Sequence, residues 1–314
     1  MRTQLIGACA LFFSVGCTST QTGNEGNFDF TYFTDDAFTN FNKPIAVGAF
    51  LDLFVDQTGT GIDVNLASAE SDNEDILEVV GFERQTFIVF ATGVGTARLS
   101  VEWTAGGVTE MDSIDMRTAI PEVLELRHTC VSGSNGQYLA GQPFFVGYEL
   151  ELNSGEPVIG YGYYPVTPSS SVIALDELSD SQAFIPLLTS DFPGSYTLDS
   201  NIDAERLGVE LVAPSQINGV MLEAGALQST FINDTDFFYV LPTVDGVEVC
   251  QANLQYSVAT TTPSICSAQE SDPSNRRTEF GWFQVTGNAS GTCTVEVTYP
   301  NVQATPIGSV DITI

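Results

Sequence analysis

The sequence predicts an all-β chain that folds as three consecutive β-sandwich domains. Short runs rich in Val, Ile, Thr, Phe and Tyr alternate apolar with polar residues, which is the period of a half-buried strand. Turn residues separate these runs, and no stretch combines a helical period with helix caps. Similar strands recur at an interval of about 100 residues, which is the length of a domain rather than of a solenoid repeat.

The repeat is visible when strands that begin with a glycine are aligned. Gly95, Gly194 and Gly291 each open such a strand. An earlier strand of each copy is introduced by another glycine, namely Gly48, Gly141 and Gly225. Domains of roughly 100 residues with several short antiparallel strands are typical of sandwiches of immunoglobulin type. Proline-containing turns near residues 119 and 214 interrupt the pattern, so we expect sandwiches over residues 31–118, 119–214 and 215–314.

The N-terminus predicts export. The apolar run "LIGACALFFSV" follows the basic Arg2. A membrane-spanning helix needs about 20 apolar residues, so this shorter run predicts a signal peptide over residues 1–16. Residues 17–30 begin with Cys17 and are rich in Thr, Gly and Asn. We therefore expect a flexible tether there.

The charge of the chain excludes one class of partner. Its 40 acidic and 9 basic side chains give a net charge of −31. Such a surface repels nucleic acids and anionic lipid headgroups. We expect no nucleic-acid binding, and a protein or glycan partner instead.

The residues "SVGC" (14–17) resemble the lipobox of bacterial lipoproteins. This resemblance implies that the thiol of Cys17 carries a diacylglycerol and that the lipid attaches the chain to a membrane. An acidic residue after the cysteine commonly retains such proteins in the inner membrane. Thr18 stands at that place, so the resemblance implies the outer membrane of a bacterial cell envelope.

The glycine-led strands of residues 31–314 resemble the bacterial immunoglobulin-like modules that many exported proteins carry in tandem. In that family the modules are spacers or adhesive units. Four cysteines follow Cys17, and an even number in an exported chain predicts two disulfides, with three possible pairings. The strands of Cys266 and Cys293 face each other across the core of such a module. This favours a Cys266–Cys293 bond and leaves Cys130 to pair with Cys250.

Two ligand sites are candidates. The acidic run "ESDNEDILE" offers Glu70, Asp72, Glu74 and Asp75, and carboxylate oxygens in loops are what calcium prefers. The alternative is a solvated acidic loop. The run "GYGYY" offers Tyr161, Tyr163 and Tyr164 as a platform on which a sugar could stack, and the alternative is core packing.

Catalysis is not expected. The chain has one histidine, His128, which shares a strand face with Leu124 and Leu126 and so fits a structural role. No GxSxG, P-loop or dinucleotide-binding motif occurs. The sequence therefore predicts a non-catalytic, lipid-anchored protein of the cell envelope with an adhesive, structural or ligand-displaying role. A carbohydrate- or calcium-binding surface module is the alternative, and an envelope hydrolase is the least favoured.

Overall fold

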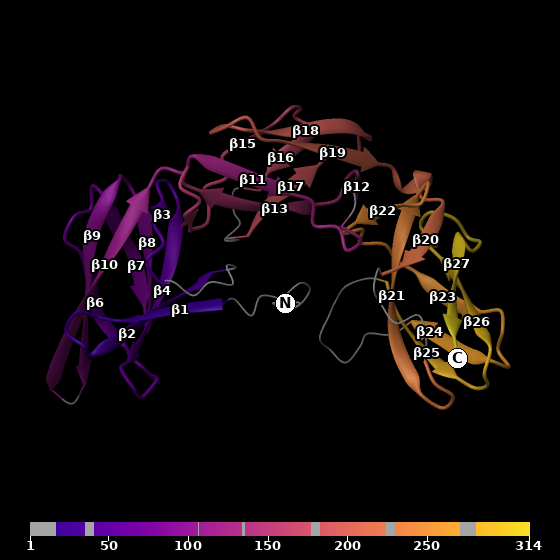
Figure 1. Ribbon diagram of the computed structural model, residues 1–314, viewed down its shortest axis with the longest axis horizontal. Helices are drawn as coiled ribbons and strands as arrows, with labels where there is room; N and C mark the ends of the chain where they lie inside the picture. The colour runs from indigo at the N-terminus through magenta and orange to yellow at the C-terminus, as the bar shows by residue number, and fades with distance from the viewer. Residues whose placement is uncertain are drawn as a thin grey trace, which may run out of the picture. The chain divides into compact units, whose positions relative to one another are not determined.

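The computed structural model describes residues 17–34, 41–105, 107–133, 136–176, 183–223, 230–270 and 281–314. This part of the chain is all-β, as predicted, and its one helical segment is the 3-10 turn Pro214–Gln216 (Figure 1). Within these residues no helix has the length and apolar character that crossing a membrane requires. The predicted signal peptide, residues 1–16, lies outside the described residues.

The chain divides into two compact units. The first contains the residues up to Glu125 together with Glu149–Pro165, and the second contains Leu126–Tyr148, Val166–Glu177 and Phe184–Ile314. These units do not follow the domain boundaries that the sequence predicts. Backbone pairing of Ile45 with Ile159 and of Phe50 with Tyr161 explains why Glu149–Pro165 belongs to the first unit.

The first sandwich consists of two sheets. One has the order β1 (Cys17–Thr22), β2 (Phe28–Thr34), β4 (Phe50–Gln57), β8 (Thr86–Ala91) and β7 (Leu77–Glu83), with β5 (Ile62–Asp63) beside β4. The other has the order β3 (Ile45–Ala46), β10 (Val108–Ala119), β9 (Gly95–Ala105) and β6 (Leu66–Ser71). Period-two alternation places apolar side chains between them, so that Phe30, Leu51 and Leu99 are fully buried. The only lysine of the sequence, Lys43, is 4% exposed.

The prediction of a flexible tether over residues 17–30 is wrong. Strands β1 and β2 form an antiparallel hairpin in which Thr20 pairs with Thr31 and Thr22 pairs with Asp29. Phe28 and Phe30 alternate with polar residues and are fully buried. Their burial ties this segment to the core, so the first sandwich begins at Cys17 rather than at residue 31.

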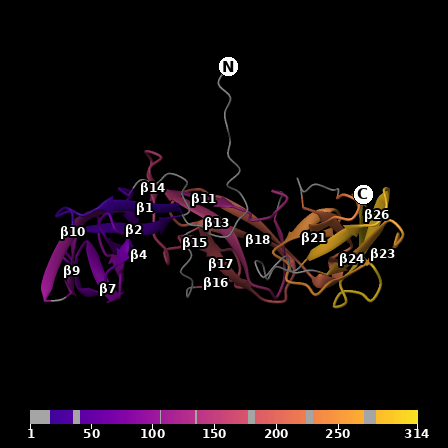
Figure 2. The ribbon, with the colours of Figure 1, turned by 90° about the horizontal axis from the view of Figure 1, so that it is seen from below.

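The second sandwich is also built from two sheets. One has the order β11 (Val123–Arg127), β13 (Phe144–Glu151), β17 (Phe184–Thr189) and β16 (Ile173–Leu175), with β14 (Pro157–Val158) beside β13. The other has the order β15 (Val166–Pro168), β18 (Gly194–Ser200), β19 (Arg206–Val212) and β12 (Gln137–Leu139). Strands β13, β17 and β16 can be followed side by side in Figure 2. Tyr138 of one sheet stacks on Phe144 of the other at 4.2 Å between ring centroids, which marks the core.

The third sandwich continues the second of these sheets. Strand β12 pairs in parallel with β22, and the sheet proceeds through β22 (Val247–Cys250), β21 (Thr235–Val244), β25 (Trp282–Gly287) and β24 (Cys266–Glu270), with β20 (Gly219–Leu222) beside β21. The facing sheet has the order β23 (Ser257–Thr260), β26 (Thr292–Thr298) and β27 (Gly308–Thr313). Phe283, Val285 and Val295 are fully buried between them.

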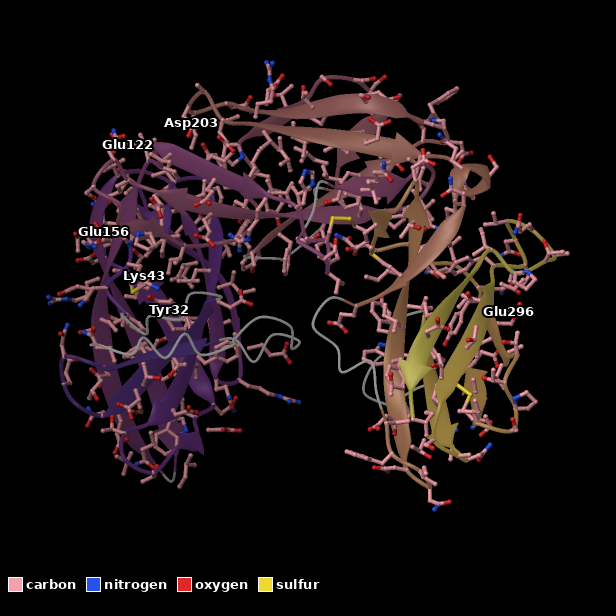
Figure 3. The ribbon with its side chains drawn as sticks, turned by 45° about the vertical axis from the view of Figure 1, so that its right-hand side comes forward. Tyr32, Lys43, Glu122, Glu156, Asp203 and Glu296 are labelled. Atoms are coloured by element: carbon pink, nitrogen blue, oxygen red, sulfur yellow. A yellow bond between two sulfur atoms is a disulfide. The ribbon has the colours of Figure 1, made fainter. Side chains whose placement is uncertain are left out.

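Both disulfides of the favoured pairing are present. Cys266 on β24 is bonded to Cys293 on β26, and this bond joins the two sheets of the third sandwich through its core. Cys130, which follows β11, is bonded to Cys250 at the end of β22. Figure 3 shows each bond as a yellow stick.

Candidate binding surfaces

The four carboxylates of the acidic run do not gather into a metal site. Glu70 lies in β6, while Glu74 and Asp75 lie in the turn that leads to β7. The carboxylate of Asp72 accepts a hydrogen bond of 2.7 Å from the backbone N–H of Arg98 and so holds this turn against β9. In the described part of the chain no group of three or more His, Cys, Asp or Glu side chains is placed to hold a metal ion.

The tyrosines of "GYGYY" pack within the first unit. The hydroxyl of Tyr161 donates a hydrogen bond of 2.7 Å to Asp52, and its ring stacks on Phe50 with centroids 5.8 Å apart. The ring of Tyr163 lies against Gly48, where an added Cβ would come within 3.2 Å of it. Tyr161, Tyr163 and Tyr164 are all half-buried. The first two thus serve packing and do not present an open stacking face.

The single histidine occupies a structural position. Its Nδ1 lies 3.2 Å from the hydroxyl of Tyr138, and burial lowers the pKa of His128. Burial also raises the pKa of Tyr138 to about 12, which keeps its hydroxyl protonated. The two groups therefore stay neutral at neutral pH and pair with each other.

A buried carboxylate organises the turn between β1 and β2. Asp112 is 1% exposed and accepts hydrogen bonds from the backbone N–H groups of Glu25, Asn27, Phe28 and Ser113 at 2.7–2.8 Å. Burial raises the pKa of Asp112, but a hydrogen bond involving the Glu25 side chain and those from the backbone N–H groups of Phe28, Glu25 and Ser113 outweigh it, so the pKa is lowered overall. The charge of Asp112 is thus part of the fold.

A second buried carboxylate works in the same way in the second unit. Glu248 on β22 is 1% exposed and accepts hydrogen bonds from the backbone N–H groups of Val131 and Ser132 at 3.0 and 2.7 Å. Val131 follows Cys130, so the carboxylate and the disulfide fix the same turn. The sequence does not reveal either carboxylate, because an acidic residue within a strand usually faces water.

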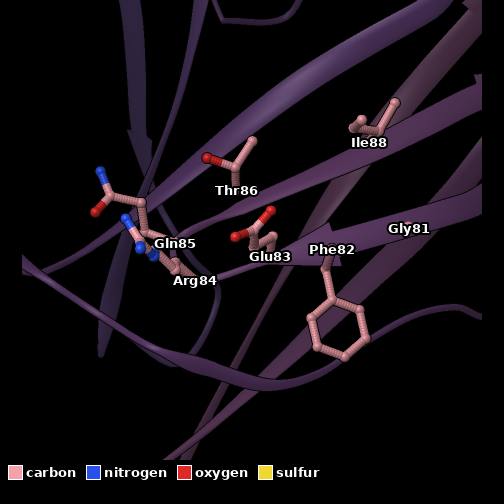
Figure 4. A pocket seen from close by; sticks show the side chains of 7 residues that line it. All are labelled: Gly81, Phe82, Glu83, Arg84, Gln85, Thr86 and Ile88. Atoms are coloured by element: carbon pink, nitrogen blue, oxygen red, sulfur yellow. The ribbon is translucent and has the colours of Figure 1, made fainter.

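The hairpin of β7 and β8 carries an open hollow of about 670 Å³ (Figure 4). It is lined by Gly81, Phe82, Glu83, Arg84, Gln85, Thr86 and Ile88. An added Cβ at Gly81 would meet nothing within 4 Å, so the missing side chain leaves this space open. The lining combines one acid and one base with the polar side chains of Gln85 and Thr86 and two apolar ones.

The outward face of β13 and β17 carries the more informative surface. Phe145, Phe184 and Leu188 are 39%, 37% and 46% exposed, although each lies within a strand. The rings of Phe145 and Phe184 lie 4.8 Å apart, and Pro186 pairs with Phe145 across the strands. We call Phe145, Phe184, Pro186 and Leu188 the apolar platform. Apolar side chains gathered on one sheet face mark a binding surface more often than scattered ones do.

A groove of about 530 Å³ adjoins the apolar platform. Phe145 and Pro186 line it together with Pro143, Asp176 and Gln251. The side-chain amide of Gln251 donates to the carbonyl of Phe145 at 2.7 Å and accepts from its N–H at 3.0 Å, as a neighbouring strand would. This pairing fixes the backbone beneath the exposed ring.

A second amide secures the same region. The side chain of Gln142 donates to the carbonyl of Asn253 and accepts from its N–H, both at 3.0 Å. The platform therefore stands on a backbone held by side-chain hydrogen bonds as well as by sheet pairing. Rigid support of this kind lowers the entropy that binding costs.

The exposure of Phe184 and Leu188 in the apolar platform is not evident from the sequence, for a physical reason. The run "FIPLLT" of β17 is almost wholly apolar, so alternation does not distinguish outward Phe184 and Leu188 from buried Ile185 and Leu187. Such a run is typical of a strand covered on both faces. The sequence does contain one sign of the platform. When Ile185 and Leu187 are assigned to the core, Phe184 and Leu188 remain as apolar residues on the opposite face of the strand.

The sheets define an all-β protein of immunoglobulin-like sandwiches with an exposed apolar face. No protein-family model matches the chain, and no curated protein sequence matches it either. Similar solved structures include FdeC, an Escherichia coli adhesin, at 12% identity and a TM-score of 0.26, covering 87% of this chain and 94% of that one.

Two further similar structures are larger than this chain. Domains 4–9 of the surface layer protein SbsC are 16% identical with a TM-score of 0.29, and the match covers 94% of this chain and 44% of that one. Invasin, a bacterial integrin-binding protein, is 12% identical with a TM-score of 0.25, covering 87% of this chain and 58% of that one.

Proposed function

We propose that this chain is a non-catalytic protein of the bacterial cell envelope, anchored by lipid on Cys17, that adheres to a protein partner through the apolar platform. The anchor is inferred from the signal-like run and the small residues before Cys17. Two disulfides support the exported location, because such bonds persist in oxidising compartments. Thr18 after the anchor favours the outer membrane.

The adhesive role depends on one observation, the exposed Phe145–Phe184 pair beside its groove. Aromatic side chains at the centre of an interface carry much of its binding energy. A protein partner suits this surface better than a charged polymer, because the platform itself consists of apolar side chains. The acidic remainder of the chain would discourage non-specific contacts with anionic surfaces.

An attachment assay tests this function. Retention on a surface coated with cells that carry the protein partner is compared for three strains. They produce the wild-type chain, a Phe145→Ser/Phe184→Ser variant or a Phe231→Ser control. Phe231 is 78% exposed and lies outside the platform, so its replacement controls for the loss of an exposed ring. We expect the double variant to lose most of the attachment and the control to keep it.

Equal attachment by all three strains would contradict the proposal, and so would an equal loss in the Phe231→Ser strain. Amounts of each chain at the cell surface are measured by antibody, so that a difference in export is not read as a difference in adhesion. Circular dichroism of the purified chains shows whether the sandwiches still form.

A further inference from the structure

The sheet of β21, β25 and β24 in the third sandwich has an outward face of a different composition. Its strands lie side by side (Figure 1). In β25, Phe283 and Val285 are fully buried, so alternation turns Trp282, Gln284 and Thr286 away from the core. The outward residues of the neighbouring strands follow from the same alternation. They are Thr235, Phe237 and Tyr239 on β21, and Ser267 and Gln269 on β24.

Strand register arranges these outward residues in three rows. Tyr239 pairs with Trp282, and their rings lie 5.2 Å apart. Phe237 pairs with Gln284, and Gln284 pairs with Gln269 on its other side.

The last row carries hydroxyls. Thr235 pairs with Thr286, and Thr286 with Ser267; the two threonine hydroxyls are 2.7 Å apart. One face thus carries an aromatic row, a mixed aromatic and amide row, and a hydroxyl row. Rows on the same face are about 7 Å apart along the strands.

These eight positions contain no charged side chain, although the chain carries a net charge of −31. The solubility of the chain does not depend on this face, because all 40 acidic side chains lie at other positions. Phe237 is 44% exposed, and Ser267, Gln269 and Thr235 are exposed as well. The face is therefore open to a ligand over at least two of its three strands.

We propose that this outward face of β21, β25 and β24 binds a neutral polysaccharide. The exposed ring of Phe237 offers flat apolar surface against which the C–H face of a sugar ring can stack, and the half-buried rings of Tyr239 and Trp282 lie in the next row. The exposed amide of Gln269 can both donate to and accept from sugar hydroxyls, and the hydroxyls of the third row can do the same. A chain of sugar units is long enough to contact more than one row at once.

Charge selects the kind of polysaccharide. An anionic polymer is repelled by the acidic chain, and it finds no cationic side chain at these eight positions. A cationic polymer finds no carboxylate there either. A neutral polyhydroxyl chain is not repelled by the acidic side chains and needs no charged partner. Its hydroxyls can form hydrogen bonds with the amides and hydroxyls of the face. The ligand and the surface differ from those of the adhesive platform, so either proposal can fail alone.

The two tryptophans of the chain allow a direct test. Trp103 lies in β9 of the first sandwich, so a Trp103→Phe variant of the full exported chain leaves Trp282 as the only indole fluorophore. This protein is titrated with laminarin, dextran and hydroxyethylcellulose as neutral polymers and with alginate as an anionic one. We expect a saturable change in Trp282 emission with at least one neutral polymer and none with alginate.

Variants then assign the signal to the face. Phe237→Ala and Gln269→Ala, each in the Trp103→Phe background, should weaken binding about tenfold, which corresponds to the loss of one stacked ring or its equivalent. Phe231→Ala is the matched control, because Phe231 is exposed near the start of β21 but is not one of the eight residues. It should bind as the parent does.

Three outcomes would overturn the proposal. The first is the absence of a saturable change with every neutral polymer. The second is an equal loss of binding in the Phe231→Ala control. The third is an emission change that follows protein concentration without polymer, since the face would then join two copies of this chain.

Discussion

At the scale of single residues, two carboxylates, those of Asp112 and Asp56, affect the stability of the first sandwich in opposite directions. Asp112 is buried and satisfied by four backbone N–H groups. Asp56 is paired across the strands with Asp29 on one side and with Asp63 on the other. Like charges at directly opposed positions destabilise a sheet. The same residue type therefore stabilises one site and destabilises the other.

Replacing Asp112 with Asn should lower the free energy of unfolding of the first sandwich by about 2–3 kcal/mol at pH 7, because a buried array of N–H donors loses its anionic acceptor. Folding lowers the pKa of Asp112, so its stabilisation is present above the ordinary value of 3.8 and is lost as the pH falls through the lowered value. The difference between variant and wild type should thus shrink in acid. Urea unfolding followed by Trp103 fluorescence in a Trp282→Phe background measures it.

A pH-independent difference between Asp112→Asn and wild type would contradict this account, because it would assign the effect to shape rather than to charge. Gly23 lies directly against the carboxylate of Asp112. An added Cβ there would fall 2.2 Å from the Asp112 carboxylate, so the turn needs glycine to approach it.

Replacing Asp56 with Asn should have the opposite effect. Burial, then Asp63, then Asp29 raise the pKa of Asp56, so its charged form is disfavoured in the folded state. The penalty is present above the raised pKa and disappears below the ordinary value of 3.8. We expect a gain of about 0.5–1 kcal/mol at pH 7 and low salt, and none at pH 3. The same fluorescence measurement applies, and a loss of stability at pH 7 would refute the argument.

At the scale of strands and their links, the disulfides differ in the length of chain that they close. Cys130 and Cys250 are separated by 120 positions, and Cys266 and Cys293 by 27. Closing a longer loop removes more entropy from the unfolded chain. Both bonds lie in the second unit, but the loop that Cys130–Cys250 closes contains Glu149–Pro165 of the first unit, whereas the loop that Cys266–Cys293 closes does not.

Removing the longer link should therefore cost more. We expect Cys130→Ala/Cys250→Ala to destabilise the second unit by about 4–5 kcal/mol and Cys266→Ala/Cys293→Ala by about 3–4 kcal/mol. Calorimetry of each variant measures the loss. In the Cys266→Ala/Cys293→Ala variant the transition reported by Trp103 should not move, and it provides the internal control there. A larger loss from the shorter link would mean that packing around Cys266 and Cys293, rather than loop entropy, dominates.

The elements also show how far the sequence can be interpreted. Apolar and polar residues alternate in "TCTVEVT", which is the pattern of a half-buried strand, and β26 buries Cys293, Val295 and Val297. The same alternation is present in "FDFTYF" from Phe28, but the Gly- and Thr-rich residues before it led to the prediction of a tether. Composition was the weaker signal there, because two buried phenylalanines outweigh a polar turn.

The return of Glu149–Pro165 to the first unit has no local signal. Its basis is long-range backbone pairing with Ile45 and Phe50, which alternation within the segment cannot reveal. For the same reason Tyr161 and Tyr163 were taken as a candidate ligand platform, whereas their contacts are with Phe50, Asp52 and Gly48. The residues that face solvent were the hardest to predict, because a strand with apolar residues on both faces does not show which face is packed into the core.

At the scale of the whole molecule, the proposed lipid anchor and the two proposed binding faces belong to different units. The hairpin of β1 and β2 begins at Cys17, so a lipid there would attach to the first sandwich without an intervening spacer. The apolar platform and the face of β21, β25 and β24 both lie in the second unit, which the proposed anchor does not occupy.

The proposed anchor makes the most direct test of this account a measurement of mass. The chain is purified from membranes of cells that produce it, and its intact mass and N-terminal peptide are determined by mass spectrometry. We predict a chain that starts at Cys17 and carries added acyl mass on that residue, and a Cys17→Ala variant that leaves the membrane fraction without it. A membrane-derived chain that starts elsewhere, or that carries no acyl group at Cys17, would contradict the account.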